Sequence, residues 1–157
     1  MEESVLPPQT QTGAGFEPTR VRQFIVFLEN RVGRLQQLVR AFEEAETRIA
    51  AMAIEESAET ALVRLICSDP DFGRGVLKRH EFAFGESEVL VVDLPRNTTE
   101  PLTTICAAML SAEISIHYAY PLLYRTALAL YVDEPTLAAE ILIRKGFKLI
   151  GESDLGN

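Results

Sequence analysis

Cysteine and histidine are scarce in this chain, and their scarcity limits the chemistry available to it. The 157 residues include two cysteines, Cys67 and Cys106, and two histidines, His80 and His117. These numbers are too small for a disulfide scaffold, and the four residues do not follow a zinc-binding pattern. Both cysteines lie inside apolar segments. We therefore expect them to be reduced core residues of a cytoplasmic protein.

The sequence also lacks the motifs of common enzyme classes and any segment suited to a membrane. It contains no Walker A loop, no Gly-x-Gly-x-x-Gly fingerprint and no Ser-His-Asp or Cys-His arrangement at a recognisable spacing. No apolar run approaches the length of a membrane span, and the N-terminus has no apolar core of a secretory signal. We predict a protein that is not an enzyme, that needs no cofactor or metal, and that has no membrane partner.

Positive charge is in deficit over the whole chain, whose formal net charge is −8. A nucleic-acid surface needs clustered lysine and arginine, so this balance argues against a nucleic-acid partner. The balance reverses between residues 20 and 40, where five arginines oppose the single acidic residue Glu29. This arginine cluster is suited to an acidic ligand, or it simply solvates an edge of the fold.

Apolar periodicity divides most of the chain into two similar halves. In the first half we expect strands at 22–28, 48–54, 61–67 and 82–84, and helices at 33–45 and 70–79. In the second we expect strands at 89–94, 114–120, 125–132 and 147–150, and helices at 102–110 and from 135 to a stop at Gly146. A shift of 67 positions places Asn30 on Asn97 and Leu35 on Leu102, which indicates an internal repeat.

This repeat predicts the fold class and the domain organisation. Each half has the order β-α-β-β-α-β of a ferredoxin-like unit. We predict an α+β fold in which two such units lie side by side and form an antiparallel sheet of about eight strands with helices on one face. Residues 1–19, rich in proline, glycine and glutamine, form a flexible leader; the repeats occupy 20–86 and 87–157. Apolar strands need cover on the other sheet face, which predicts a homodimer packed sheet to sheet or edge to edge.

The stretch Glu29 to Leu35 is the strongest candidate for a binding site. It follows the apolar strand at 24–28 and precedes an amphipathic helix, so it is a strand-to-helix turn in which Gly33 permits a sharp bend. The helix N-terminus offers unpaired N–H groups and partial positive charge to a carboxylate, and Arg31 and Arg34 add cations. The alternative is a tight connection with two solvated arginines. Asn30 is equally suited to forming the turn and to contacting a ligand.

The chain resembles tandem ACT-domain proteins from about residue 22 to 155. The resemblance rests on the turn from Asn30 to Leu35, similar to the Asn-x-Pro-Gly-x-Leu turn of that family, and on the stretch from Asp133 through Gly146 to Lys148. Val32 stands where proline is usual. In the second repeat Glu100 stands where glycine is expected, so the first turn is the stronger site. The resemblance implies regulatory modules that bind amino acids between paired domains, and these ligand-binding residues: Asn30, Arg31, Val32, Gly33, Arg34, Leu35, Asn97, Thr98 and His117.

These observations predict a stand-alone regulatory protein that binds a small ligand, an amino acid, between its two repeats. Two alternatives remain open. One is a small regulatory subunit of an amino-acid biosynthetic enzyme such as acetolactate synthase. The other is a structural dimerisation module with a degenerate pocket, which Glu100 and the absent proline favour.

Overall fold

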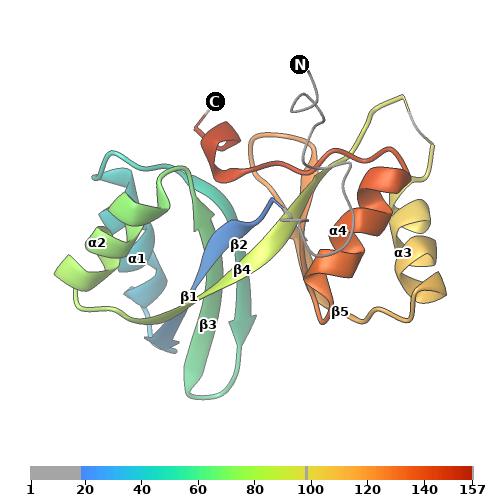
Figure 1. Ribbon diagram of the computed structural model, residues 1–157. Helices are drawn as coiled ribbons and strands as arrows, with labels where there is room; N and C mark the ends of the chain where they lie inside the picture. Colours follow the sequence, from blue (N-terminus) through green and yellow to red (C-terminus); the bar gives the residue numbers. More distant parts are fainter. Residues whose placement is uncertain (1–18, 98, 157) are drawn as a thin grey trace.

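The computed structural model describes residues 19–97 and 99–156. Most of the expected leader and Thr98 lie outside the described residues. The elements are, in chain order, β1 (Val21–Glu29), α1 (Arg34–Glu43), β2 (Ile49–Glu56), β3 (Thr60–Cys67), α2 (Pro70–Arg79), β4 (Ala83–Asp93), α3 (Pro101–Ser111), β5 (Ile116–Pro121), β6 (Ala127–Val132), α4 (Pro135–Arg144) and the 3-10 turn η3 (Glu152–Asp154). The six strands pair antiparallel in the order β2-β3-β1-β4-β6-β5 (Figure 1).

The expected sheet of about eight strands is wrong, because β4 replaces two of the expected strands. The turn expected at 85–87 does not form: Gly85 and Ser87 pair with Ile25 and Gln23 of β1, so the chain stays extended. The first part of β4 pairs with β1 and its last part pairs with β6. The strand therefore runs through residues 86 and 87, where the two repeats were expected to divide.

The other missing strand is the last one, expected at 147–150. Only Leu149 forms an isolated bridge, with Val92 of β4. Two backbone hydrogen bonds flank it: the Ile150 N–H donates to Val91 at 2.8 Å, and the Asp93 N–H donates to Lys148 at 2.9 Å. The segment thus lies beside β4, where the predicted last strand of the second repeat was expected, although it is too short and irregular to count as a strand.

The helix boundaries follow local chemistry that the sequence displays. The expected helix at 70–79 is confirmed as α2, where the Asp69 carboxylate accepts a hydrogen bond from the Phe72 N–H at 3.1 Å and Pro70 occupies the first turn. The stop expected at Gly146 is also confirmed, since this residue follows α4 with a φ of 93°.

The four helices lie on the outer face of the sheet, in two pairs at opposite ends of the molecule (Figure 1). Helices α1 and α2 cover the first repeat, where Phe24, Phe42 and Leu65 form the centre of one buried cluster. Helices α3 and α4 cover the second repeat over a separate cluster that includes Ile105 and Leu142. Each repeat therefore has its own core on the outer side of the sheet.

The inner face of the sheet buries itself because the sheet curls. A third cluster draws Val21 and Ile66 from the first repeat and Tyr120, Ala129 and Ile150 from the second. The edge strands β2 and β5 meet at the bridge between residues 51 and 122. The expectation that a second chain must cover this sheet face is therefore wrong, since the two repeats cover each other.

The two cysteines differ in environment. Cys67 is buried under α2, and burial raises the pKa of its thiol to about 11. Cys106 is exposed on α3. The expectation of two core cysteines is wrong for Cys106 because α3 is apolar on its outward face as well as on its buried face.

Candidate functional site

The turn between β1 and α1 has the backbone form that its glycine allows. Gly33 caps α1 with a φ of 93°, and the Arg34 N–H donates to the Arg31 carbonyl at 3.3 Å. A Cβ added at Gly33 would meet no atom within 4 Å. Glycine is therefore favoured here for its left-handed conformation, which costs a side chain about 1 kcal/mol, and not for space.

Asn30 braces this turn against the β2–β3 hairpin. Its side-chain amide donates to the Ser57 carbonyl at 2.8 Å, and its backbone N–H donates to the Glu59 carbonyl at 3.0 Å. Arg31 forms an exposed ion pair with Glu29 at 2.6 Å. The structure thus gives Asn30 a role in forming the turn.

Beside the turn lies a cavity of about 290 Å³. Four of the predicted ligand-binding residues line it, whereas Val32 and Gly33 do not, and the Val32 side chain is fully exposed. Apolar residues form half of the lining, namely Leu28, Leu35, Ile54, Ala61 and Val63. Polar groups complete it, namely Glu29, Asn30, Arg31, Arg34 and Glu56. All these residues belong to the first repeat, so this cavity, which we call the turn cavity, does not lie between the repeats.

Arg34 is the least satisfied polar group of the turn cavity. Its guanidinium lies 5.0 Å from the centre of the Phe82 ring, and Nη1 donates to Gln37 at 2.5 Å. Its Nε is buried and has no hydrogen-bond partner among residues 19–97 and 99–156. A buried donor left in this state is costly, and Arg34 still contributes a positive charge to the cavity wall.

The second repeat preserves the backbone of the turn but changes its chemistry. Glu100 caps α3 with a φ of 56°, the same left-handed conformation as Gly33. Asn97 is exposed. A cavity of about 360 Å³ lies beside this turn, lined by residues that include Asp93, Arg96 and Arg125. The Arg125 guanidinium lies 3.7 Å from the Asp93 carboxylate, so part of its charge is already neutralised.

Gly33 and Glu100 therefore occupy equivalent positions in two equivalent turns. Residues 19–157 match the family model described as an ACT domain pair. The chain belongs to this family. The match covers every described residue and agrees with the two βαββα units, each completed by a segment that pairs beside β4 or β1.

Solved structures similar to this ACT pair include protein BT0572 from Bacteroides thetaiotaomicron, with 26% identity, a TM-score of 0.79, and coverage of 88% of this chain and 96% of that chain. The regulatory subunit of aspartate kinase from Thermus thermophilus, in its ligand-free form, has 10% identity, a TM-score of 0.55, and coverage of 82% and 93%. Aspartokinase alpha and beta subunits have 13% identity, a TM-score of 0.53, and the same coverage. The last two likenesses show the fold alone. No protein of curated function matches the chain significantly.

His117 lies apart from the turn cavity of the ACT pair. It is exposed on β5, and its ring centre lies 5.8 Å from that of Tyr131. The structure thus places the predicted residues other than Thr98, which lies outside the described residues, in three separate regions: the first turn, the second turn and strand β5.

A cavity between the repeats lies elsewhere, at the far end of α1. Its volume is about 510 Å³, and its lining includes Phe42, Ile49 and Met52 of the first repeat with Leu123 and Tyr124 of the second. Sequence reasoning missed this inter-repeat cavity because the loop at 122–126 carries no recognisable motif.

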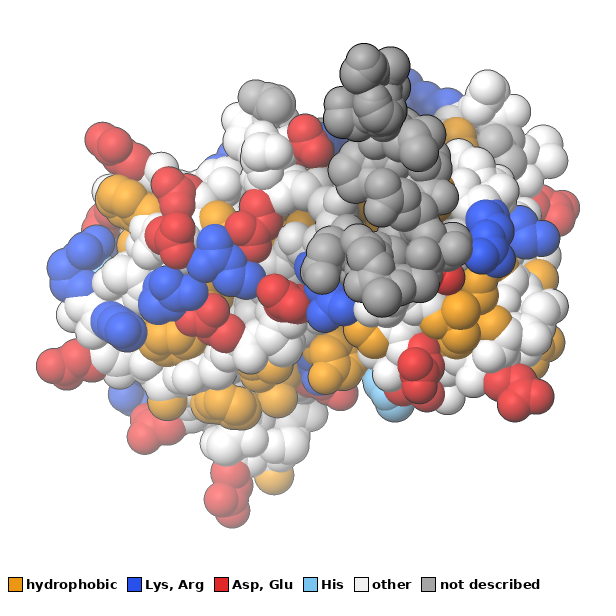
Figure 2. Space-filling model, viewed as in Figure 1, with side chains coloured by type: hydrophobic (Ala, Val, Ile, Leu, Met, Phe, Trp, Pro, Cys, Tyr) orange, Lys and Arg blue, Asp and Glu red, His pale blue; other side chains and the backbone are white. Residues whose placement is uncertain are grey.

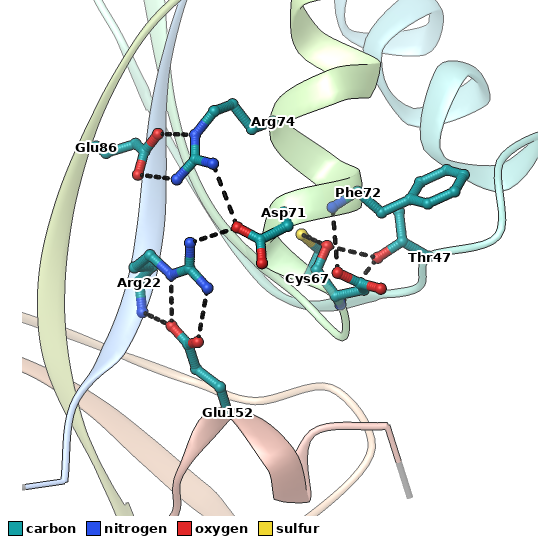
Figure 3. Close-up of polar contacts among 9 residues, drawn as sticks. Arg22, Thr47, Cys67, Asp71, Phe72, Arg74, Glu86 and Glu152 are labelled. Atoms are coloured by element: carbon teal, nitrogen blue, oxygen red, sulfur yellow. Dashed lines mark hydrogen bonds and ion pairs between the residues drawn. The ribbon is translucent and has the colours of Figure 1, made fainter.

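An ion-pair network also joins the two repeats of the ACT pair (Figure 3). Arg22 of β1 donates to both carboxylate oxygens of Glu152 in η3 at 2.9 Å, and to Asp71 of α2 at 2.8 Å. Arg74 continues the network from Asp71 to Glu86 of β4. The hydrogen bonds from Arg22 lower the pKa of Glu152 and of Asp71, and those from Arg74 lower the pKa of Glu86.

Charges of both signs cover the molecule on the side seen in Figure 2. Lysine and arginine alternate with aspartate and glutamate over the half that carries α1 and α2, so no basic stripe forms on that face. Within residues 19–97 and 99–156, no cluster of His, Cys, Asp and Glu is suited to a metal ion. None of the helices in the same part of the chain is long and apolar enough to cross a membrane.

Proposed function

We propose that this ACT pair is a stand-alone regulatory protein that binds a small amino-acid-like effector in the turn cavity. Membership of the family supports a regulatory role over catalysis. The observation that carries the proposal is the lining of the turn cavity, which places Arg31 and Arg34 beside an apolar wall. An effector carboxylate would pair with these guanidinium groups.

The remaining groups of the turn cavity suit the other parts of an amino acid. Glu29 and Glu56 offer carboxylates to an ammonium group, and the apolar wall accepts a side chain. Ligand pockets have volumes of roughly 300–1,000 Å³. The turn cavity, at about 290 Å³, is at the small end of this range, which favours a free metabolite over a nucleotide or a large cofactor.

An effector bound in the turn cavity would act on the elements that line it. The cavity draws its wall from β1, α1 and the β2–β3 hairpin, so an effector would hold these elements in one arrangement. Coupling between sites is typically worth about 1–3 kcal/mol, which is sufficient to alter the affinity for a partner severalfold.

A regulatory subunit of a biosynthetic enzyme is the second candidate function. It is supported by the likeness of fold to the regulatory subunit of aspartate kinase from Thermus thermophilus, of which the match covers 93%. This alternative predicts that the chain co-purifies with a catalytic subunit, which could belong to another enzyme such as acetolactate synthase. A structural module with a degenerate pocket predicts neither an effector nor a catalytic partner.

A thermal-shift screen against the twenty amino acids tests the effector proposal. An effector present at about 100 times its dissociation constant should stabilise the protein by roughly 2.7 kcal/mol, or about 5–10 °C. Arg34→Met should weaken binding by roughly 10- to 100-fold, because it removes charge-assisted hydrogen bonds worth about 1.5–3 kcal/mol. Titration calorimetry would measure this change.

Matched variants identify which cavity is used. Gly33→Asp adds a negative charge at the turn and should abolish binding of a carboxylate, while Ala45→Phe fills the inter-repeat cavity and should leave the affinity unchanged. The reverse pattern would move the effector to the inter-repeat cavity. No shift with any of the twenty amino acids would favour the structural module.

A further inference from the structure

The inter-repeat cavity has apolar walls from both repeats. Phe42 of α1 and Met52 of β2 line it from the first repeat, and Phe42 is fully buried. Leu123 and Tyr124 line it from the second repeat, in the loop that joins β5 to β6. These two side chains are 54% and 64% exposed. Large apolar side chains exposed together beside a cavity of about 510 Å³ form a surface suited to the apolar part of a ligand.

Direct contacts fix the two walls relative to each other. The Leu123 N–H donates to the Ala50 carbonyl at 2.8 Å. The Arg48 guanidinium lies 4.5 Å from the centre of the Tyr124 ring, and its Nη2 donates to the Leu155 carbonyl at 3.4 Å. Because these contacts are made within the chain, the shape of the cavity is formed before a ligand binds, which lowers the cost of binding.

Negative charge predominates at the rim of the inter-repeat cavity. Glu43 and Glu46 line it, both are exposed, and neither forms an ion pair in the part of the chain that the structure describes. Helix α1 also ends at Glu43, which places the negative end of its dipole at the same rim. Arg48 is the one basic residue among the described residues of the lining, and its guanidinium already lies on the Tyr124 ring. The rim therefore favours a cation.

The neutral polar side chains of the lining are already hydrogen-bonded within the chain. The Thr47 Oγ1 accepts from the Asp69 N–H at 3.1 Å, and the Ser68 Oγ accepts from the Arg48 N–H at 2.9 Å. These hydroxyl groups therefore do not require a partner from a ligand. The carboxylates at the rim are the polar groups best placed to bind one.

We propose that the inter-repeat cavity is a second binding site, whose ligand is a small apolar amine without a carboxylate. The ammonium group pairs with Glu43 and Glu46, and the aliphatic or aromatic body covers Met52 and Leu123. Such a ligand contacts both repeats and stabilises them in their present arrangement. The inter-repeat cavity shares no lining residue with the turn cavity, so the two proposals fail independently.

Amide NMR titration of the full chain with phenethylamine tests this site. Phenethylamine has an ammonium group on a short apolar body, and phenylpropionate and phenylethanol are its acidic and neutral counterparts. Phenethylamine should produce saturable shifts in the amide signals of residues 42–52 and 122–126, which surround the cavity. The acid should produce none there, and the alcohol should bind about fivefold more weakly or worse, because it lacks the charge.

Variants of each cavity assign the binding. The double variant Glu43→Gln with Glu46→Gln changes only exposed side chains and should weaken phenethylamine binding about fivefold or more. Glu29→Gln with Glu56→Gln makes the same change in the turn cavity and should leave the affinity for phenethylamine unchanged. Ala45→Phe fills the inter-repeat cavity and should abolish the shifts. The glutamine variants keep the test valid if this substitution prevents folding.

Three results would overturn the proposal. The first is the absence of saturable shifts around the inter-repeat cavity. The second is loss of phenethylamine binding in Glu29→Gln with Glu56→Gln, which would place the amine in the turn cavity. The third is equal binding of phenylpropionate or phenylethanol, which would remove the role of the rim carboxylates. Arg34→Met, which should weaken an effector in the turn cavity, should leave phenethylamine binding unchanged.

Discussion

Two adjacent residues of β1 attach the second repeat from opposite faces of the strand. Arg22 points outward and binds Glu152 of η3, while Gln23 points inward and is fully buried. The Gln23 amide donates to the Tyr118 hydroxyl and accepts from the Tyr120 hydroxyl, each at 2.5 Å. Alternation of side chains along a strand is the reason that neighbours in sequence serve different faces. Burial raises the pKa of Tyr120 and keeps its hydroxyl a donor to Gln23.

Arg22→Met should lower the free energy of unfolding by about 2 kcal/mol at neutral pH, because hydrogen bonds to charged groups contribute roughly 1.5–3 kcal/mol. Urea denaturation would measure the change. Arg31→Met is the control: the pair of Arg31 with Glu29 is 62% and 73% exposed, so its loss should cost about 0–1 kcal/mol. Equal costs for the two variants would contradict a linking role for Arg22.

The same variant makes stability depend less on pH. Arg22 lowers the pKa of Glu152 in the folded state, so the unfolded chain binds the proton more readily. The resulting stabilisation is complete above the unfolded pKa of about 4.3 and is lost as the pH falls through the lower folded pKa. Urea midpoints from pH 6 downward should therefore decline less steeply for Arg22→Met than for the wild type below about pH 4.3.

At the scale of elements, the first turns of α1 and α3 share a backbone but not a residue. Gly33 adopts its positive φ without strain, whereas Glu100 has a side chain in the same region, which costs roughly 1–2 kcal/mol. The two repeats thus share the geometry of the turn although only the first has the glycine. This conformational cost is borne at the N-cap of α3.

A pair of substitutions separates conformation from chemistry at these turns. Gly33→Ala should destabilise the protein by about 1 kcal/mol through φ alone, since no atom lies within 4 Å of the added Cβ. Glu100→Gly should leave stability unchanged or raise it by up to about 1 kcal/mol, because relief of strain exceeds the added freedom of the unfolded chain. Thermal unfolding should show a lower midpoint for Gly33→Ala and no lower midpoint for Glu100→Gly; destabilisation by both substitutions would contradict the equivalence of the turns.

At the scale of the whole molecule, β4 and the inner cluster make the two repeats one structural unit. β4 pairs with strands of both repeats, and the inner cluster contains residues from both. Neither repeat keeps its inner face covered without the other.

Calorimetry should therefore record a single unfolding transition, with calorimetric and van't Hoff enthalpies in agreement at more than one protein concentration. Two resolved transitions would show that the repeats unfold separately in spite of the shared strand.

Local patterns predicted the helices and most strands because their signals are contained within a few residues. Asp69-Pro70 marks the start of α2, and alternation marks β5 and β6. The same reasoning failed at Gly85 to Ser87, where turn-forming residues stay extended because β1 pairs with them. Pairing with a distant strand overrides local preference, and a single sequence window carries no information about it.

Periodicity and repetition are local properties, so they were sufficient to predict two repeated units of the order β-α-β-β-α-β and a sharp turn at Gly33 before the first helix. Contacts between distant residues were needed to show that Glu100 adopts the same left-handed conformation, that the units share a strand and that the sheet curls until its inner face is buried. The tertiary structure also places the turn cavity within the first repeat, and it brings Arg22 of the first repeat into contact with Glu152 of the second. These outcomes depend on contacts between residues far apart in the chain, where packing and charge complementarity act.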